Sequence, residues 1–156
     1  MKKFQYRGEI DGLRAIAVLI VIFYHIDFNI FGINFFRGGY IGVDVFFVIS
    51  GYLITSIILA DLSRNEFRLV LFYERRIRRI LPVLLTVILA TLPFAWFYMS
   101  PSAISDYAGS ILSSLFFGSN VWFWAEDSYW AGDSILKPLL HTWSLSVEEQ
   151  FYILYP

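Results

Sequence analysis

The chain alternates long apolar stretches with short charged segments. Residues 45–60, 80–105 and 107–125 contain no formal charge, and residues 12–31 are largely apolar. A helix needs about 20 predominantly apolar residues to cross the hydrocarbon core of a bilayer. The pattern therefore predicts three or four membrane-crossing helices within one domain that occupies residues 1–156.

Turn signals between the apolar stretches set the expected boundaries. A glycine-containing turn follows the first stretch, a charged loop follows the second, and Pro82 suits the first turn of a helix. The predicted fold is an all-α, polytopic transmembrane helical bundle. Its helices are expected over residues 12–31, 40–60, 82–98 and 104–124, and another is expected to begin at residue 146.

The stretch at residues 104–124 is polar for a segment that would face lipid. It contains serines, glycines and Asn120, and acidic residues follow it. We expect it to cross the membrane, although the acidic residues would then lie on the cytoplasmic side. A re-entrant segment, buried by the rest of the protein, is the alternative that stays open.

Composition agrees with a membrane protein and excludes some chemistry. Hydrophobic residues make up 58% of the chain, charged residues only 16%, and the mean hydropathy is +0.61, whereas about 25% of an average soluble chain is charged. The first apolar stretch does not resemble a signal peptide, because it is long and carries Arg14 and His25. There is no cysteine, which excludes disulfides, thiolate catalysis and cysteine-based metal sites.

The positive charges indicate an orientation. Most of the basic residues lie either between Lys2 and Arg14 or between Arg64 and Arg79. The positive-inside rule places both clusters on the cytoplasmic side, with one hairpin of two spans between them. The net charge of −1 gives no indication of a nucleic-acid partner, and none is expected.

Two ionisable residues share one face of the first predicted helix. Arg14 and His25 are eleven positions apart, so they lie within roughly 20° of each other and about 16 Å apart along the axis. Arg14 is either part of a polar seam or a snorkelling anchor, and His25 is either part of that seam or a polar helix contact. Asp44 either orients His25 or caps its own helix and faces external water.

An arginine run precedes the third predicted helix. Residues three apart on a helix are neighbours, and paired guanidiniums form a fork that fits phosphate oxygens. The alternative is an orientation signal or a contact with anionic lipid. The run comprises Arg75, Arg76, Arg78 and Arg79.

The last stretch, HTWSLSVEEQFYILYP, places two acids before an apolar run. Ser146 and Glu149 are predicted to form a capping box, with Ser146 as the N-cap residue and Glu149 at the third helical position. Glu148 then has no local structural role. His141 lies just upstream, and a histidine paired with a carboxylate is suited to moving a hydroxyl proton.

Four motifs in this order closely resemble the membrane-bound acyltransferase type 3 family, which includes O-antigen, nodulation-factor and peptidoglycan O-acetylases. The resemblance covers essentially the whole chain and is most similar to bacterial members that also carry a C-terminal SGNH hydrolase-like domain. It implies a multi-pass protein of the bacterial inner membrane with about ten helices, of which this chain supplies the N-terminal four or five. The motifs are EIDGLRAIAVLIVIFYH, GGYIGVDVFFVISGYLIT, FYERRIRRILP and PLLHTWSLSVEEQFY.

The resemblance also implies an activity. Such proteins take an acyl group, commonly acetyl, from cytoplasmic acyl-CoA and deliver it to a carbohydrate hydroxyl across the membrane. The expected donor is therefore acetyl-CoA, without a metal, and the expected partners are acyl-CoA, a carbohydrate acceptor and membrane lipids.

Residue roles follow by motif match. His25 matches the favoured catalytic residue, a general base or acyl carrier, and Arg14 matches its basic partner. The Arg-x-x-Arg pair implicated in acyl-CoA binding corresponds to Arg76 and Arg79. The acidic motif, thought to support catalysis or acceptor binding, corresponds to Glu148 and Glu149.

Three other interpretations remain open. The polar seam could be the substrate path of a transporter or exporter component for an envelope glycan. His25 and His141 could be the axial ligands of a b-type haem. The chain ends within an expected helix, so it is expected to be an N-terminal fragment, which could be inactive by itself.

Overall fold

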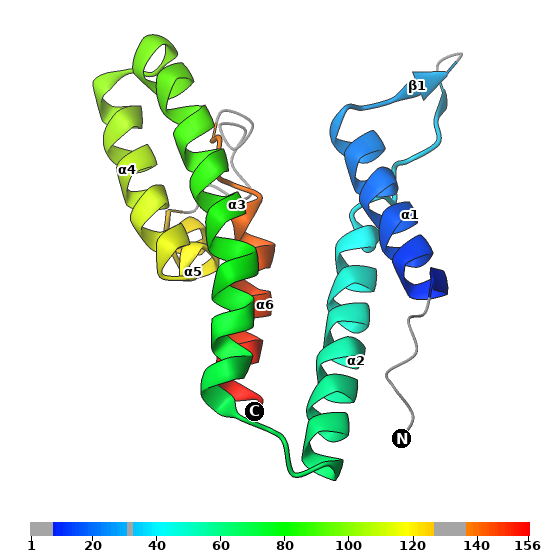
Figure 1. The fold of residues 1–156 in the computed structure, drawn as a ribbon. Coiled ribbons are helices and arrows are strands. Elements are labelled where there is room, and N and C mark those ends of the chain that lie inside the picture. The colour runs from blue at the N-terminus through cyan, green and yellow to red at the C-terminus, as the bar shows by residue number, and fades with distance from the viewer. Residues whose placement is uncertain (1–7, 31–32, 127–136) are drawn as a thin grey trace. The chain divides into compact units, whose positions relative to one another are not determined.

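The computed structural model describes residues 8–30, 33–126 and 137–156 (Figure 1). The chain divides into two compact units, residues 1–67 and residues 68–156. Each unit is built mainly from helices.

The first unit is a helical hairpin. Helix α1 (Gly8–His25) and helix α2 (Ile41–Ser63) are joined through two short antiparallel strands, β1 (Asn29–Ile30) and β2 (Ile33–Asn34). Helix α1 begins before the expected residue 12 and ends before residue 31, because the chain turns into the strand pair.

Glycines let the two helices of this hairpin pack closely. A Cβ atom at Gly42 would lie 2.7 Å from Ala17 O and 2.7 Å from Val21 Cγ2, and a Cβ at Gly39 would lie 2.5 Å from Tyr24 Cβ. Only a residue without a side chain fits at such distances. The glycines of GGYIGV therefore permit the close approach of α1 and α2.

The second unit begins with the long helix α3 (Leu69–Tyr98), which passes through Pro82 and Pro93. The expected start at residue 82 is therefore wrong. Proline removes one backbone donor, and the helices of membrane proteins tolerate that loss within their length. The arginine run consequently lies on the first turns of α3 and not in a loop before it.

The expected helix at residues 104–124 is two helices. Helix α4 (Pro101–Leu115) begins after Ser100, whose side chain accepts a hydrogen bond from Ala103 N, and helix α5 (Ser119–Ala125) follows. The chain turns between them at Phe117, which has a φ of 52°, and Gly118 N donates to Ser113 O at 2.7 Å. Neither helix is long enough to cross a membrane by itself.

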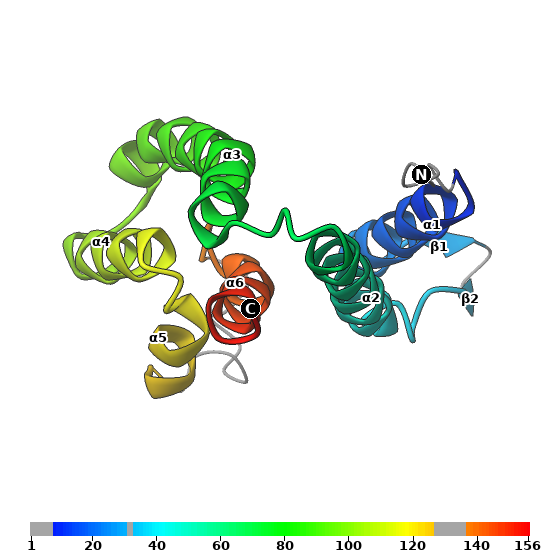
Figure 2. The same ribbon diagram turned by 60° about the horizontal axis from the view of Figure 1, so that its bottom comes forward.

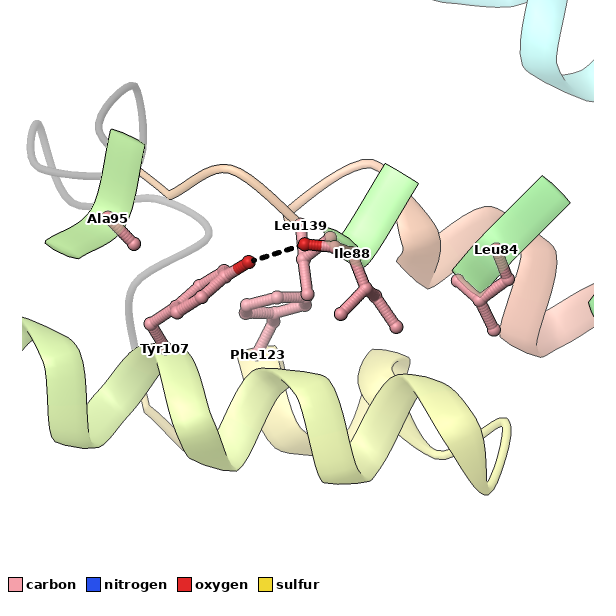
Figure 3. Close-up of a cluster of buried hydrophobic side chains, with 6 residues drawn as sticks. All are labelled: Leu84, Ile88, Ala95, Tyr107, Phe123 and Leu139. Atoms are coloured by element: carbon pink, nitrogen blue, oxygen red, sulfur yellow. Dashed lines mark hydrogen bonds between the residues drawn. The ribbon is translucent and has the colours of Figure 1, made fainter. Parts of the chain in front are cut away.

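A small apolar core holds the second unit together (Figure 3). The Tyr107 hydroxyl lies 2.6 Å from Thr91 Oγ1 and donates to Ile88 O at 3.4 Å, which satisfies a buried polar group between α3 and α4. The core residues are Leu84, Ile88, Ala95, Tyr107, Phe123 and Leu139.

The last helix, α6 (Thr142–Leu154), lies beside the first half of α3 in both views (Figures 1 and 2). Leu139, just before α6, belongs to the same core as Leu84. At the other end of α6, Ile153 O accepts a hydrogen bond from the Tyr73 hydroxyl at 3.0 Å. The two helices are therefore antiparallel.

Two helices of the described residues, α2 and α3, are long and apolar enough to cross a membrane. The expectation of an all-α fold is confirmed within residues 8–30, 33–126 and 137–156, apart from the β1–β2 pair. A polytopic bundle is consistent with these helices.

Candidate functional site

A cluster of charged and aromatic side chains joins α3 to α6, and we call it the arginine cluster. Arg76 Nη1 lies 3.5 Å from Glu149 Oε1. Arg76 Cζ lies 3.4 Å from the centroid of the Tyr152 ring and 5.4 Å from that of Phe72. The Tyr152 hydroxyl donates a hydrogen bond to Glu148 Oε1. The cluster comprises Phe72, Arg76, Glu148, Glu149 and Tyr152.

Helical spacing explains why these side chains meet. Phe72 and Arg76 are four apart on α3, and Glu148 and Glu149 lie four and three positions before Tyr152 on α6. Residues three and four apart share one helix face. Each helix therefore presents its members of the arginine cluster on a single face, and the antiparallel arrangement brings the two faces together.

Because Glu149 is buried, its pairing with Arg76 matters for the stability of the fold. Glu149 is only 7% exposed, and a carboxylate removed from water is destabilised unless a cation or hydrogen-bond donors compensate. Arg76 supplies that cation, and its side chain is 21% exposed. Within the described part of the chain, Arg76 Nε is buried without a hydrogen-bond acceptor, so the ring of Tyr152 and the carboxylate of Glu149 are the principal contacts of this cation.

The predicted capping box is wrong. Helix α6 begins at Thr142 and His141 occupies the N-cap position, so Ser146 lies inside the helix. The Ser146 side chain contacts Ser119, with Oγ atoms 2.7 Å apart and Ser119 N donating to Ser146 Oγ at 3.2 Å. Glu149 consequently has no capping role, and its carboxylate is available to Arg76.

A row of small polar residues packs α6 against α4 and α5. Thr142 Oγ1 lies 2.8 Å from Ser114 Oγ and 3.0 Å from Ser119 Oγ. Further along, Gln150 and Asn120 exchange two amide hydrogen bonds of 3.2 and 2.8 Å. This row was not predicted, although the four-residue spacing of Thr142 and Ser146 indicates one polar face on the helix.

The other arginines of the run differ from Arg76. Arg78 forms an exposed ion pair with Glu74 at 2.7 Å, whereas Arg75 and Arg79 are exposed and lie four apart on one face of α3. The sequence pattern alone did not distinguish the four arginines, and the motif match singled out Arg76 and Arg79 as a pair. The structure engages Arg76 within the protein and leaves Arg75 and Arg79 exposed to solvent.

The first unit holds three of the remaining predicted site residues, Arg14, His25 and Asp44. His25 is exposed, and its Nδ1–H donates to Val21 O at 2.8 Å, which places the proton of the neutral ring on Nδ1. The Arg14 guanidinium lies 5.7 Å from the centroid of the Phe46 ring. Asp44 is exposed in the first turn of α2, and among the described residues no hydrogen bond or ion pair joins it to His25.

His141 lies in the second unit, at the start of α6. Its side chain is exposed, and its carbonyl oxygen accepts a hydrogen bond from Ser144 Oγ at 3.2 Å. His141 is seven positions, or about two helical turns, before Glu148. It therefore lies outside the arginine cluster.

Comparison with known proteins matches the whole chain to one group. A family model described as an acyltransferase domain covers residues 7–156. The chain is 40% identical over 154 residues to the peptidoglycan O-acetyltransferase OatA of Listeria monocytogenes, which covers 97% of the chain and 24% of the relative. It is 37% identical over 153 residues to the O-acetyltransferase OatA of Staphylococcus aureus strain NCTC 8325, again covering 97% and 24%.

A putative O-acetyltransferase, SAS0844 of Staphylococcus aureus strain MSSA476, is 40% identical over 156 residues, which covers 99% of the chain and 25% of the relative. The chain thus spans about a quarter of the length of these curated relatives. No solved structure matches it. With its matched domain extending over residues 7–156, and with the four motifs in family order, the chain belongs to the acyltransferase type 3 family.

Proposed function

We propose that this chain is part of an integral-membrane O-acyltransferase of the bacterial inner membrane. It moves an acyl group, most simply acetyl, from cytoplasmic acyl-CoA to a hydroxyl of a cell-envelope carbohydrate. The observation that carries the proposal is the arginine cluster, which joins the FYERRIRRILP and VEEQFY motifs through the pair of Arg76 and Glu149. The names of the relatives favour acetyl as the group and peptidoglycan as an acceptor.

The donor site is proposed at the start of α3. The positive-inside rule places this end of the helix at the cytoplasmic surface, where acyl-CoA is available. Arg75 and Arg79 are exposed and close enough to share the phosphates of one ligand. In this proposal Arg76 orients the site from within and Arg79 contacts the donor.

The antiparallel packing of α3 and α6 supports a re-entrant path for residues 101–125. Helix α3 leaves the cytoplasmic side at Tyr73, and the end of α6 returns to Tyr73 through Ile153 O. A full crossing by α4 and α5 would start α6 at the cytoplasmic side and direct it away from Tyr73. The turn at Phe117 supports the same path, since it ends α4 after less than one membrane thickness.

The proposed chemistry is general-base acyl transfer. His25 Nε2 takes the proton of the attacking hydroxyl, and Arg14 and Asp44 set the electrostatic environment of the first unit. One acyl C–S bond breaks, one acyl C–O bond forms, and the proton ends on the thiol of CoA. Glu148 supports catalysis or acceptor binding, and a covalent acyl-histidine is the alternative route to the same products.

The test uses the full-length protein in membrane vesicles with labelled acetyl-CoA and a carbohydrate acceptor. The expected result is transfer of label to the acceptor, and loss of transfer in His25→Ala. A matched control is His141→Ala, which removes the other histidine. Undiminished transfer by His25→Ala would overturn its assigned role, and movement of the glycan without consumption of acetyl-CoA would favour a transporter.

A further inference from the structure

We propose that Tyr152 is a positioning residue that holds Arg76 with its ring and Glu148 with its hydroxyl. The inference rests on the proposed function and adds a residue that neither the motif match nor the sequence pattern assigned. Tyr152 is 2% exposed, so its ring and its hydroxyl both lie within the protein.

The face of the ring fixes the cation. The Arg76 guanidinium carbon lies 3.4 Å from the centroid of the Tyr152 ring, well within the range of about 6 Å over which a cation interacts with an aromatic face. Because Arg76 Nε has no acceptor among the described residues, the ring compensates for hydrogen bonds that this edge of the guanidinium does not form. Phe72, with its centroid 5.4 Å from the guanidinium carbon, is the more distant of the two rings.

The hydroxyl fixes the acid. Tyr152 donates to Glu148 Oε1 from the next turn of the same helix. A hydrogen bond from a buried donor to a carboxylate holds that side chain in one rotamer and leaves its second oxygen to face a ligand. Glu149 is already held by Arg76, so each glutamate of the adjacent pair has its own partner.

One side chain therefore connects two parts of the proposed reaction. The ring acts on the arginine run, where the donor is proposed to bind, and the hydroxyl acts on the glutamate proposed to support catalysis or acceptor binding. The two functions can be separated by mutation, since phenylalanine keeps the ring and removes the hydroxyl, whereas leucine removes both.

The experiment compares Tyr152→Phe and Tyr152→Leu in the full-length protein, with labelled acetyl-CoA as the varied substrate. Tyr152→Phe should lower kcat by about tenfold through the lost bond to a charged group, with the KM for acetyl-CoA unchanged. Tyr152→Leu should in addition raise that KM by about tenfold, because the arginine run loses its anchor. Tyr155→Phe is the matched control, since Tyr155 is 45% exposed at the C-cap position of α6, and this variant should retain the activity of the unmodified protein.

A double-mutant cycle separates positioning from a general structural effect. If the hydroxyl acts through Glu148, then Glu148→Gln with Tyr152→Phe should be no slower than Glu148→Gln alone. A matching cycle of Arg76→Met with Tyr152→Leu, measured by thermal unfolding in detergent, should give a non-additive shift in Tm. This second cycle needs no activity, so it tests the contact of ring and cation by itself.

The possible outcomes are distinct. Full activity of Tyr152→Phe, or additive effects in the Glu148 cycle, would overturn the positioning role of Tyr152 while leaving the acyltransferase proposal intact. An unmodified protein that transfers no label from acetyl-CoA would overturn the proposed function. If no label is transferred, the Tm measurements still test the contact of Arg76 with the Tyr152 ring. Additive Tm shifts of Arg76→Met and Tyr152→Leu would overturn this contact, and non-additive shifts would support it.

Discussion

Arg76 and Glu149 form an ion pair across two helices, with Nη1 and Oε1 3.5 Å apart although the two residues are 73 positions apart along the chain. The pair is mostly shielded from water and is covered on one side by the ring of Tyr152. Each residue belongs to a different family motif, so this ion pair and the contact of Arg76 with the Tyr152 ring join the two motifs.

Replacing Glu149 by glutamine should destabilise the second unit. The change leaves the Arg76 cation without its counter-ion, and we expect a loss of about 2 kcal/mol in the free energy of unfolding, between the values for exposed and buried ion pairs. Denaturant unfolding in detergent, followed by far-UV circular dichroism, measures it. The control is Glu74→Gln, which breaks the exposed pair with Arg78 and should cost less than about 0.5 kcal/mol. Equal losses in the two variants would show that burial of Glu149 has no energetic effect.

The close approach of α1 and α2 predicts different effects for two glycines of α2. Gly42→Ala places a methyl group 2.7 Å from Ala17 O and should separate the helices, at a cost of about 1–3 kcal/mol. At Gly51 no atom of the described residues lies within 4 Å of the added Cβ, and alanine is favoured over glycine in a helix by about 1 kcal/mol. Measured by thermal unfolding in detergent, Tm should be lower for Gly42→Ala than for the unmodified protein. It should be unchanged or higher for Gly51→Ala. A lower Tm for Gly51→Ala alone would contradict the packing described.

Ser146 should be more important for stability than a cap residue would be. Ser146→Ala leaves the fully buried Ser119 without the acceptor of its backbone N–H, and an unsatisfied buried donor costs about 1–3 kcal/mol. Ser144→Ala is the matched control, because Ser144 Oγ bonds only to the carbonyl of His141 in its own helix among the hydrogen bonds described. The comparison is made by chemical unfolding of both variants. A loss at Ser146 no larger than that at Ser144 would contradict the stabilising contact of Ser146 with Ser119.

The exposed arginines predict a salt-sensitive donor site. Arg79→Gln and Arg75→Gln should each raise the KM for acetyl-CoA by about tenfold, with little change in kcat, because they remove a charge–phosphate contact. The increase should shrink as ionic strength rises, since exposed charges are screened. Arg64→Gln is the control, as an exposed arginine in the same basic region outside the run. A KM that rises equally for Arg64→Gln would indicate a general surface potential and not a defined site.

Local patterns predicted local features well. The long uncharged stretches predicted helices, because helix formation depends on residues near in sequence. The start of α3 was misplaced because Pro82 suits a first turn and is also tolerated inside a long helix. The Ser146 cap failed for a related reason, since a Ser-x-x-Glu spacing also occurs on one face of a helix interior.

The arginine cluster could not be predicted from residues that are close in sequence. The four neighbouring arginines gave no sign that Arg76 is the one packed against α6, because that depends on which face of α3 meets a helix more than forty residues later. The same long-range packing decides the roles of the glutamates. Glu149 faces Arg76, whereas Glu148 is held by Tyr152.

The antiparallel contact of α3 and α6 also constrains how genes of this family can recombine. Any crossover between the codons of residues 77 and 148 separates Arg76 from Glu149 and Tyr152. A chimera joined there inherits a functional pair only when both parents carry the same charges and ring at these three positions. Distant segments of the coding sequence are thus expected to be inherited together, as one co-adapted block.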